Sequence, residues 1–485
     1  MGSVRDFRPV LFVVGILLIT LSLAMALPAI ADAVTGDPHW RVFLAASVFT
    51  LFIGTCLVLS NRMREPRLTV RQAFVLTTLS WVVVAAFAAL PFAFSDLNLS
   101  YTDGYFEAMS GLTTTGSTVI VGLDQAPTGI LLWRALLQWL GGIGIIVTAI
   151  AILPMLRIGG MQLFHTESSD SSEKVLPRAA QLAGAIGLVY LGLTVSNGIA
   201  YWAAGMTPFE AACHAMTTIA TGGFSTSDSS LGHFKNDAIE GIATIYMVLG
   251  SLPFVLYLQA VRGGWGALVR DTQVRWFFGL ILFALLSLAG WLMAANDAAP
   301  TDAFREAAFN GISILTGTGY STADFSDWGT FALPVFTLLM FIGGCTGSTT
   351  GGVKVFRMQV LASTSLSQIR QLIQPHGVFI SKFNRRPIPE SVAPAVMGFF
   401  FLFVVIFGLI AMGLALMGLD YVTSISGAAT AIANVGPGLG ETIGPSGSFQ
   451  PLPDPAKWLL SAAMLLGRLE LFTVLVLFVP RFWRD

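Results

Sequence analysis

The segment Thr113-Thr114-Thr115-Gly116-Ser117 decides the fold, because a short glycine-centred segment of the same kind occurs four times in the chain. The other copies are Ala220-Thr221-Gly222-Gly223-Phe224, Thr316-Gly317-Thr318-Gly319-Tyr320 and Ala433-Asn434-Val435-Gly436-Pro437. Each copy lies between two long apolar stretches. Small residues are common where membrane helices pack together, which would explain a single copy. Four copies at equivalent places instead predict a repeated unit whose loops meet at one axis.

The composition indicates a membrane protein. The chain has 485 residues, of which 54% are hydrophobic and only 11% are charged. Soluble domains carry about 25% charged residues, so this chain lacks the polar surface that a soluble protein needs, and we expect it to contact the lipid bilayer. The net charge of −1 gives no indication of nucleic-acid binding. Cys56, Cys213 and Cys345 lack the spacing of a disulfide framework or a zinc site.

Two apolar runs, about 9–31 and 42–60, precede the repeats and are long enough to span a bilayer. A cleavable signal peptide is the alternative for the first run, because Arg5 and Arg8 precede it and Ala29-Ile30-Ala31 could be a cleavage site. The predicted segments are 1–70 for the leading helices and 71–177, 178–271, 272–390 and 391–485 for the four units.

Each unit is expected to contain a long apolar helix, a half-helix that ends at the glycine segment, and a second apolar helix. In the first unit these are about 71–95, 103–114 and 129–156. The half-helices are too short to cross, because a crossing takes about 20 residues, so they must enter the membrane and return. The predicted fold is therefore an all-α integral membrane protein with four pseudo-symmetric helix–pore-helix–helix units around one central pore.

The basic residues predict the orientation. Most of the 26 lysines and arginines fall in loops 61–71 and 262–275, in the stretch 354–386 and near both termini. By the positive-inside rule this side is cytoplasmic, so the glycine loops open outward. Most of the 27 acidic residues fall on that outer side, and an acidic mouth concentrates cations. Ordinary solvated loops would explain part of this pattern.

The glycine segments suit a ring of backbone carbonyls. A half-helix that points its C-terminus toward the axis places negative dipole there, and glycine permits the backbone angles that turn carbonyls inward. Such a ring can replace the hydration shell of a cation. The expected filter residues are Thr114, Thr115, Gly116, Thr221, Gly222, Gly223, Gly317, Thr318, Gly319, Asn434, Val435 and Gly436.

Over its whole length the chain resembles the Trk/Ktr/HKT superfamily of potassium transporters, and most closely the bacterial TrkH-type membrane subunit. The motifs that carry the resemblance are Thr113–Ser117, Ala220–Thr226, Thr316–Ser321 and Asn434–Gly438. It implies potassium uptake across the bacterial inner membrane, with K⁺ held at the filter residues and no covalent cofactor. Some plant relatives replace the first glycine by serine and favour sodium, so glycine at all four positions implies potassium selectivity. The unlike segments predict fewer well-formed carbonyl sites than in a tetrameric channel.

The second apolar helix of the third unit is interrupted. The run Phe331–Ile342 is too short to cross, and Gly343-Gly344-Cys345-Thr346-Gly347-Ser348-Thr349-Thr350-Gly351-Gly352 follows it. Because each glycine costs about 1 kcal/mol inside a helix, this stretch is predicted to be a loop at mid-membrane. TrkH-like proteins have a gating loop at this place, which implies gate roles for Gly343, Gly344, Gly347, Gly351 and Gly352.

Arg468 lies inside the apolar span 458–479, where an arginine costs about 2.5–3.5 kcal/mol. Glu470 should project to the opposite side of a helix and so be a poor partner, which leaves the carbonyls of the 343–352 loop. The resemblance implies a pore-facing gate arginine at Arg468. A structural salt bridge is the alternative reading.

Partners are implied by the resemblance alone: a homodimer with one pore per protomer, and a cytosolic nucleotide-binding RCK-type subunit that docks on segments 157–178 and 370–390. A potassium/proton or potassium/sodium symporter is the alternative function, with Glu470 as the one deep carboxylate. We expect no enzyme, because HExxH, GxSxG and paired intramembrane aspartates are missing from the sequence. The group Glu210, Cys213 and His214 is better explained by packing.

Overall fold

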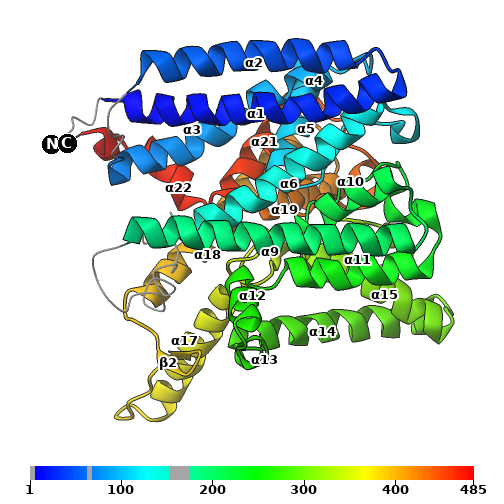
Figure 1. The fold of residues 1–485 in the computed structure, drawn as a ribbon. Helices are drawn as coiled ribbons and strands as arrows, with labels where there is room; N and C mark the ends of the chain where they lie inside the picture. Colours follow the sequence, from blue (N-terminus) through cyan, green and yellow to red (C-terminus); the bar gives the residue numbers. More distant parts are fainter. Residues whose placement is uncertain (1–5, 63–67, 152–174, 485) are drawn as a thin grey trace.

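The structure is a computed structural model that describes residues 6–62, 68–151 and 175–484 (Figure 1). Its described part is almost entirely helical, and its strands are the short pair β1 (Lys382–Phe383) and β2 (Arg386–Pro387), which are antiparallel. Within these residues, seven helices are long and apolar enough to cross a membrane, or up to nine spans if each of two bent pairs is counted as one. The predicted all-α, multi-pass fold is confirmed for these residues.

The two leading helices are α1 (Arg8–Thr35) and α2 (Trp40–Ser60), which pack along each other at one edge of the molecule (Figure 1). The first repeat contains α3 (Val70–Ala88), α4 (Leu90–Ala93), α5 (Tyr101–Leu112), η1 (Leu123–Gln125) and α6 (Thr128–Ala151). The second contains α9 (Val175–Ala203), α10 (Pro208–Ile219), η2 (Ser230–Phe234), α11 (Asp237–Gly250), α12 (Phe254–Val261) and α13 (Gly266–Arg270).

The third repeat contains α14 (Thr272–Ala295), α15 (Pro300–Leu315), η3 (Phe325–Trp328), α16 (Ala332–Phe341) and α17 (Val355–Ile373). The fourth contains α18 (Val392–Leu416), α19 (Tyr421–Ala433), α20 (Gly440–Ile443), α21 (Asp454–Arg468), α22 (Phe472–Leu475), η4 (Val476–Phe478) and η5 (Pro480–Trp483). The four short helices α5, α10, α15 and α19 are the predicted half-helices.

Local sequence fixes where three of the half-helices begin. Capping boxes start α5 at Ser100 and α10 at Thr207, with Asp103 and Glu210 as the reciprocal partners. Asp420 caps α19, and its hydrogen bonds from Thr423 lower the pKa of its carboxyl below the ordinary value.

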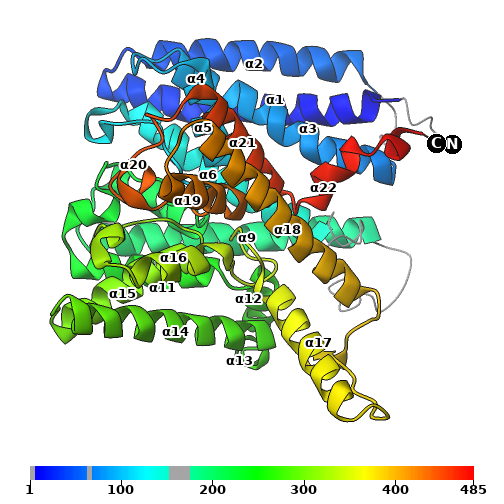
Figure 2. The ribbon, with the colours of Figure 1, turned by 180° about the vertical axis from the view of Figure 1, so that it is seen from behind.

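The repeats form a closed circle. The second helix of each repeat packs against the half-helix of the next: α6 against α10, α11 against α15, α16 against α19, and α21 against α5. Figure 2 shows the same bundle from behind, with α19 near the middle of the view and α21 close to α5 and α18. Because the last contact returns to the first repeat, the four half-helices surround a shared centre.

Two predicted helices are broken. The helix expected to run through 250–254 bends by 93° between α11 and α12, and the span around Arg468 bends by 108° between α21 and the segment Phe472–Phe478. The expectation of one continuous span over 458–479 is therefore wrong. The span predicted at about 71–95 is present as one apolar stretch, Val70–Ala93, which comprises α3 and α4. Pro253 explains the first break, since proline cannot donate the helical hydrogen bond.

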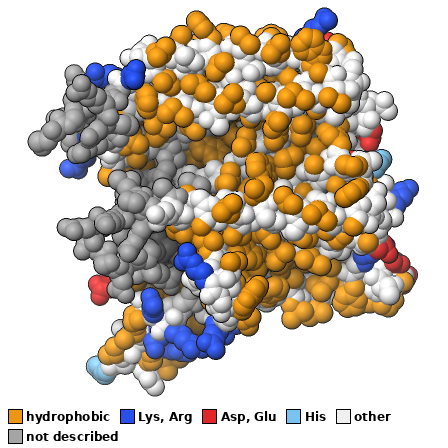
Figure 3. All heavy atoms as spheres, viewed as in Figure 1, with side chains coloured by type: hydrophobic (Ala, Val, Ile, Leu, Met, Phe, Trp, Pro, Cys, Tyr) orange, Lys and Arg blue, Asp and Glu red, His pale blue; other side chains and the backbone are white. Residues whose placement is uncertain are grey.

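The surface agrees with a membrane protein. Figure 3 shows apolar side chains over the middle of this face, with most visible Lys and Arg at the left and lower left and most visible Asp and Glu at the right. The two chain ends lie together, since the rings of Phe7 and Trp483 are 6.4 Å apart. Arg157, Lys174 and the polar stretch 165–173 lie outside the described residues.

Candidate ion pathway

The four glycine segments share one backbone conformation. The glycines at 116, 223, 319 and 436 all have positive φ, between 77° and 109°. Two positions earlier, Thr114, Thr221, Gly317 and Asn434 also have positive φ, between 50° and 66°. Non-glycine residues adopt this conformation rarely, so its return at Thr114, Thr221 and Asn434 marks a backbone that its surroundings impose.

These four segments also close a ring. A Cβ atom on Gly116 would collide with the carbonyl oxygen of Gly222, and one on Gly223 with the carbonyl oxygen of Thr318. In the same order, Gly319 abuts the carbonyl of Val435, and Gly436 abuts that of Thr115. Each glycine therefore touches the carbonyl one residue before the next glycine around the circle. The structure brings all four predicted segments together at one place.

Side chains join neighbouring segments behind this ring. Ser117 Oγ donates to the Gly436 carbonyl at 2.7 Å, and Asn434 Nδ2 donates to Thr115 Oγ1 at 2.9 Å. Tyr320 Oη lies 2.5 Å from Thr217 Oγ1 of α10. These contacts cross from one repeat to the next, so each segment is held by its neighbours as well as by its own half-helix.

The stretch 343–352 is a non-helical loop between α16 and α17, as the sequence predicts. Gly343 and Gly344 are buried, Gly347 is buried with positive φ, and Gly351 and Gly352 are half-buried. Gly343 N donates to Val353 O at 2.9 Å, which closes the base of the loop. A Cβ on Gly351 would collide with the Ala433 carbonyl at the end of α19. The loop therefore lies directly against the ring.

Arg468 reaches the loop. Its side chain is 2% exposed, and Nη1 donates to the Thr349 carbonyl at 2.9 Å. The predicted partner, a loop carbonyl, is confirmed. Glu470 pairs instead with Arg357 of α17. A small cavity beside the loop is lined by both Arg468 and Lys354, and Lys354 Nζ donates to Thr350 Oγ1 at 3.0 Å.

Thr349 connects the loop to the ring. Its Oγ1 donates to the carbonyls of Ile219 (3.1 Å) and Gly250 (2.9 Å), and it accepts from Thr221 Oγ1 at 3.1 Å. The carbonyl of the same residue holds Arg468. One threonine thus bonds to the second glycine segment with its side chain and to the arginine with its backbone.

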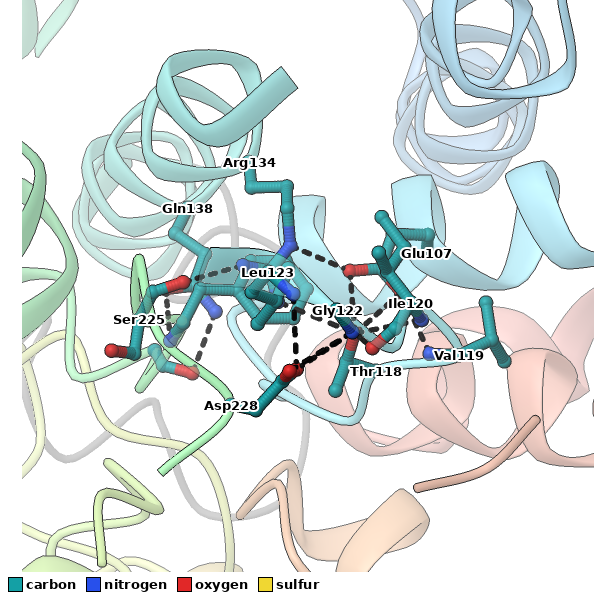
Figure 4. Close-up of polar contacts among 12 residues, drawn as sticks. Glu107, Thr118, Val119, Ile120, Gly122, Leu123, Arg134, Gln138, Ser225 and Asp228 are labelled. Carbon is teal, nitrogen blue, oxygen red and sulfur yellow. Dashed lines mark hydrogen bonds and ion pairs between the residues drawn. The ribbon is translucent and has the colours of Figure 1, made fainter. Parts of the chain in front are cut away.

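Sequence reasoning missed Gln138 and Arg134, which lie on the buried face of α6 (Figure 4). Gln138 Nε2 donates to the Gly222 carbonyl at 2.6 Å, and its Oε1 accepts from Phe224 N at 3.0 Å. Arg134 pairs with Glu107 of α5. The available signal was two polar residues four positions apart in an apolar helix, which share one helix face.

The group Glu210, Cys213 and His214 has structural contacts. His214 is fully buried, its Nδ1 lies 2.8 Å from the Glu210 carbonyl, and its Nε2 lies 3.0 Å from Ser225 Oγ. Both ring nitrogens are thus bonded to the half-helix and to the segment that follows it. Within the described residues no cluster of His, Cys, Asp or Glu could hold a metal ion.

A circle of four half-helices, a shared ring of loops and a glycine-rich loop that lies against the ring define a pore-forming membrane transport protein. The comparisons agree: a family model described as "TrkH: Cation transport protein" matches residues 39–484. The chain is 46% identical to the Trk system potassium uptake protein TrkI of Halomonas elongata, over 100% of this chain and 98% of that protein. It is 38% identical to TrkH of Escherichia coli, over 99% and 100%. The crystal structure of the potassium transporter TrkH from Vibrio parahaemolyticus superimposes with a TM-score of 0.92 at 38% identity, covering 99% of this chain and all of that one. The chain belongs to the TrkH family of cation transport proteins.

Proposed function

We propose that this protein takes up potassium through the ring formed by the four glycine segments. The observation that carries the proposal is the cyclic order of contacts, in which each glycine abuts the next segment's carbonyl. Such closeness requires glycine, because any side chain would push neighbouring segments apart. Four converging backbones can offer carbonyl oxygens to a dehydrated monovalent cation. The names of the relatives support potassium as that cation.

The filter comprises the twelve residues at 114–116, 221–223, 317–319 and 434–436. Two of the carbonyls there already accept hydrogen bonds, Gly222 from Gln138 and Gly436 from Ser117. A carbonyl that is so engaged ligates an ion less strongly. This supports a filter with fewer complete sites than four identical segments would give.

The gate comprises the loop glycines at 343, 344, 347, 351 and 352 together with Arg468. A fixed positive charge on the path below the ring repels a cation, and the loop fills the space beside it. The buried Lys354 on the same cavity adds a second positive charge. Displacing Arg468 and the loop together opens the path.

The protein lies in the bacterial inner membrane with both termini cytoplasmic and the filter facing outward. The clustering of Lys and Arg near the chain ends in Figure 3 supports this orientation. The repeat boundaries remain 71–177, 178–271, 272–390 and 391–485. The protein has no enzymatic activity and no covalent cofactor.

Two protomers form a homodimer, each with its own pore, and a cytosolic RCK-type nucleotide-binding subunit moves the gate. The docking segment 370–390 begins in the last turn of α17, which follows the gating loop. A movement of the docked subunit that displaces α17 would therefore be transmitted to the loop by this one helix. The other docking segment, 157–178, lies mostly outside the described residues.

Purified protein in liposomes tests the function and separates channel from symporter. Currents of a channel reverse at the potassium equilibrium potential whatever the pH or sodium gradient. A symporter's reversal potential moves with the coupled gradient. Glu470 is bound to Arg357, which disfavours it as a proton carrier and supports the channel. Flux of sodium equal to that of potassium would refute the filter.

A further inference from the structure

A buried ion pair lies behind the first two filter segments and is distinct from both the ring and the gate. Arg134 Nε donates to Glu107 Oε1 at 2.8 Å, and the two side chains are 1% and 0% exposed. A buried ion pair is weak evidence for stability, because desolvation offsets the attraction. Its presence in so apolar a chain therefore points to a task other than holding the fold together.

The pair holds the chain just beyond two glycine segments at once. On the first, Glu107 Oε2 accepts from Val119 N at 2.9 Å, and Thr118 Oγ1 donates to Glu107 Oε1 at 3.0 Å. On the second, Arg134 Nη1 donates to the Ser225 carbonyl at 2.6 Å, and the guanidinium lies 4.1 Å from the centre of the Phe224 ring. Figure 4 shows Glu107 and Arg134 pointing toward each other between these segments.

Gln138 extends this arrangement into the filter itself. It lies one helical turn after Arg134, and its amide binds both the Gly222 carbonyl and the Phe224 amide. The Gly222 carbonyl is the one that abuts Gly116 across the seam between the first two repeats. We call Arg134 and Gln138 of α6, together with Glu107 of α5 that pairs with Arg134, the α6 bracket.

Ion pairs also cross the other three seams, at Arg305–Asp237, Arg357–Glu470 and Lys457–Asp103. Hydroxyl groups join the second and third repeats, through Tyr320 and Thr217, and the fourth and first, through Ser117. Charge-assisted hydrogen bonds are roughly twice as strong as neutral ones. What distinguishes the α6 bracket is that its side chains also bond to the chain at or just beyond two glycine segments.

We propose that the α6 bracket sets the ion selectivity of the filter by fixing the distance between its first and second segments. This rests on the proposed function of the ring. Its members are positioning residues, which act on the permeating ion through the Gly222 and Thr115–Gly116 backbone. When the carboxylate charge is lost, Arg134 loses its anchor, the seam relaxes, and smaller ions are coordinated as well as potassium.

The test compares potassium and sodium flux in liposomes for wild type and Glu107→Gln, with thermal unfolding measured in parallel. We expect the potassium preference of Glu107→Gln to fall several-fold. Removing one member of a buried pair also destabilises, so the double variant Glu107→Gln, Arg134→Met is included, because it leaves no unpaired charge. It should regain thermal stability while its selectivity stays low. Thr118→Val, which removes one hydroxyl beside the pair, should lower selectivity less.

Lys457→Gln is the matched control. Lys457 Nζ pairs with Asp103 at 2.6 Å, one turn earlier on α5 and without contact to a filter segment. The Lys457→Gln variant should unfold at a lower temperature than wild type but keep the wild-type preference for potassium over sodium. Wild-type selectivity in folded Glu107→Gln or in the folded double variant would overturn the bracket, while a wild type that does not prefer potassium would overturn the filter itself.

Discussion

The four proposed filter segments and the proposed gating loop are both runs of small residues, yet they are held in different ways. Each filter glycine lies against a backbone carbonyl of a neighbouring repeat, which leaves no room for a side chain. The loop has backbone hydrogen bonds to the bend between α11 and α12, from Cys345 N to the Ser251 carbonyl and from Phe254 N to the Gly347 carbonyl. It is also bonded through the side chains of Arg468, Thr349 and Lys354. Two nitrogens of Arg468, Nε and Nη2, have no hydrogen-bond partner in the described structure.

This difference indicates which region moves. A backbone that is fixed from four directions keeps one geometry, which selectivity requires. A loop that is bonded through individual hydrogen bonds can exchange some of them for bonds to water or to an ion, because a typical hydrogen bond contributes about 0.5–1.5 kcal/mol. We therefore expect substitutions in the ring to change which ion passes, and substitutions at the loop to change how much.

The largest effect is expected from Gly223→Ala. The new methyl group would collide with the Thr318 carbonyl, and the left-handed backbone adds about 1–2 kcal/mol for any L-residue. Potassium preference over sodium should be lost, measured as the flux ratio in liposomes. Gly192→Ala is the control, since a methyl group there meets no atom within 4 Å. A selective, well-folded Gly223→Ala would show that the ring is not the filter.

Arg468→Ala should have the next largest effect, and on rate rather than on selectivity. It removes the positive charge below the ring and the donor that holds Thr349. Potassium leak through the purified protein should rise at least about tenfold, because a hydrogen bond to a charged group contributes about 1.5–3 kcal/mol, and the potassium-to-sodium ratio should stay unchanged. Arg481→Ala, an exposed arginine near the C-terminal end, should behave as wild type. Unchanged leak would remove Arg468 from the gate.

Lys354→Met should raise the leak less than Arg468→Ala. Methionine fills much of the same volume without the charge, and the Lys354 ammonium lies at the edge of the cavity, where it bonds to Thr350. Single-channel recording should show more frequent openings of unchanged selectivity. The exposed Lys382→Met on β1 serves as the control. If neither substitution alters opening, Arg468 is the only cation of the gate.

Much of this arrangement could be predicted from local sequence. The caps at Ser100, Thr207 and Asp420 and the glycines after the half-helices are signals within one short segment. Arg468 was conspicuous because an arginine in an apolar run needs a polar partner. Features of this kind depend on few residues, so a single sequence reveals them.

The missed features depend on residues far apart in the chain. Glu107 and Arg134 meet across two helices, and Gln138 binds a segment of another repeat, so no spacing rule connects them. No proline lies near Arg468, so the sequence does not predict the bend that follows it. The bend is formed by Glu470 and Leu471, both with positive φ, and Glu470 is bound to Arg357 over a long sequence separation. Tertiary contacts override the apolar pattern there.

The smallest effect, and the sharpest test of the contrast, is expected from Thr349→Val. The substitution preserves shape but removes the hydroxyl that bonds the loop to the Ile219 and Gly250 carbonyls beside the filter. Losing one such bond, at about 1 kcal/mol, should raise open probability about fivefold. Thr346→Val is the matched control, because the Thr346 hydroxyl has no hydrogen-bond partner in the described structure. A change in the potassium-to-sodium ratio of Thr349→Val, without a change in opening, would mean that the loop supports the filter rather than closes the path, and the division between a rigid ring and a movable gate would fail.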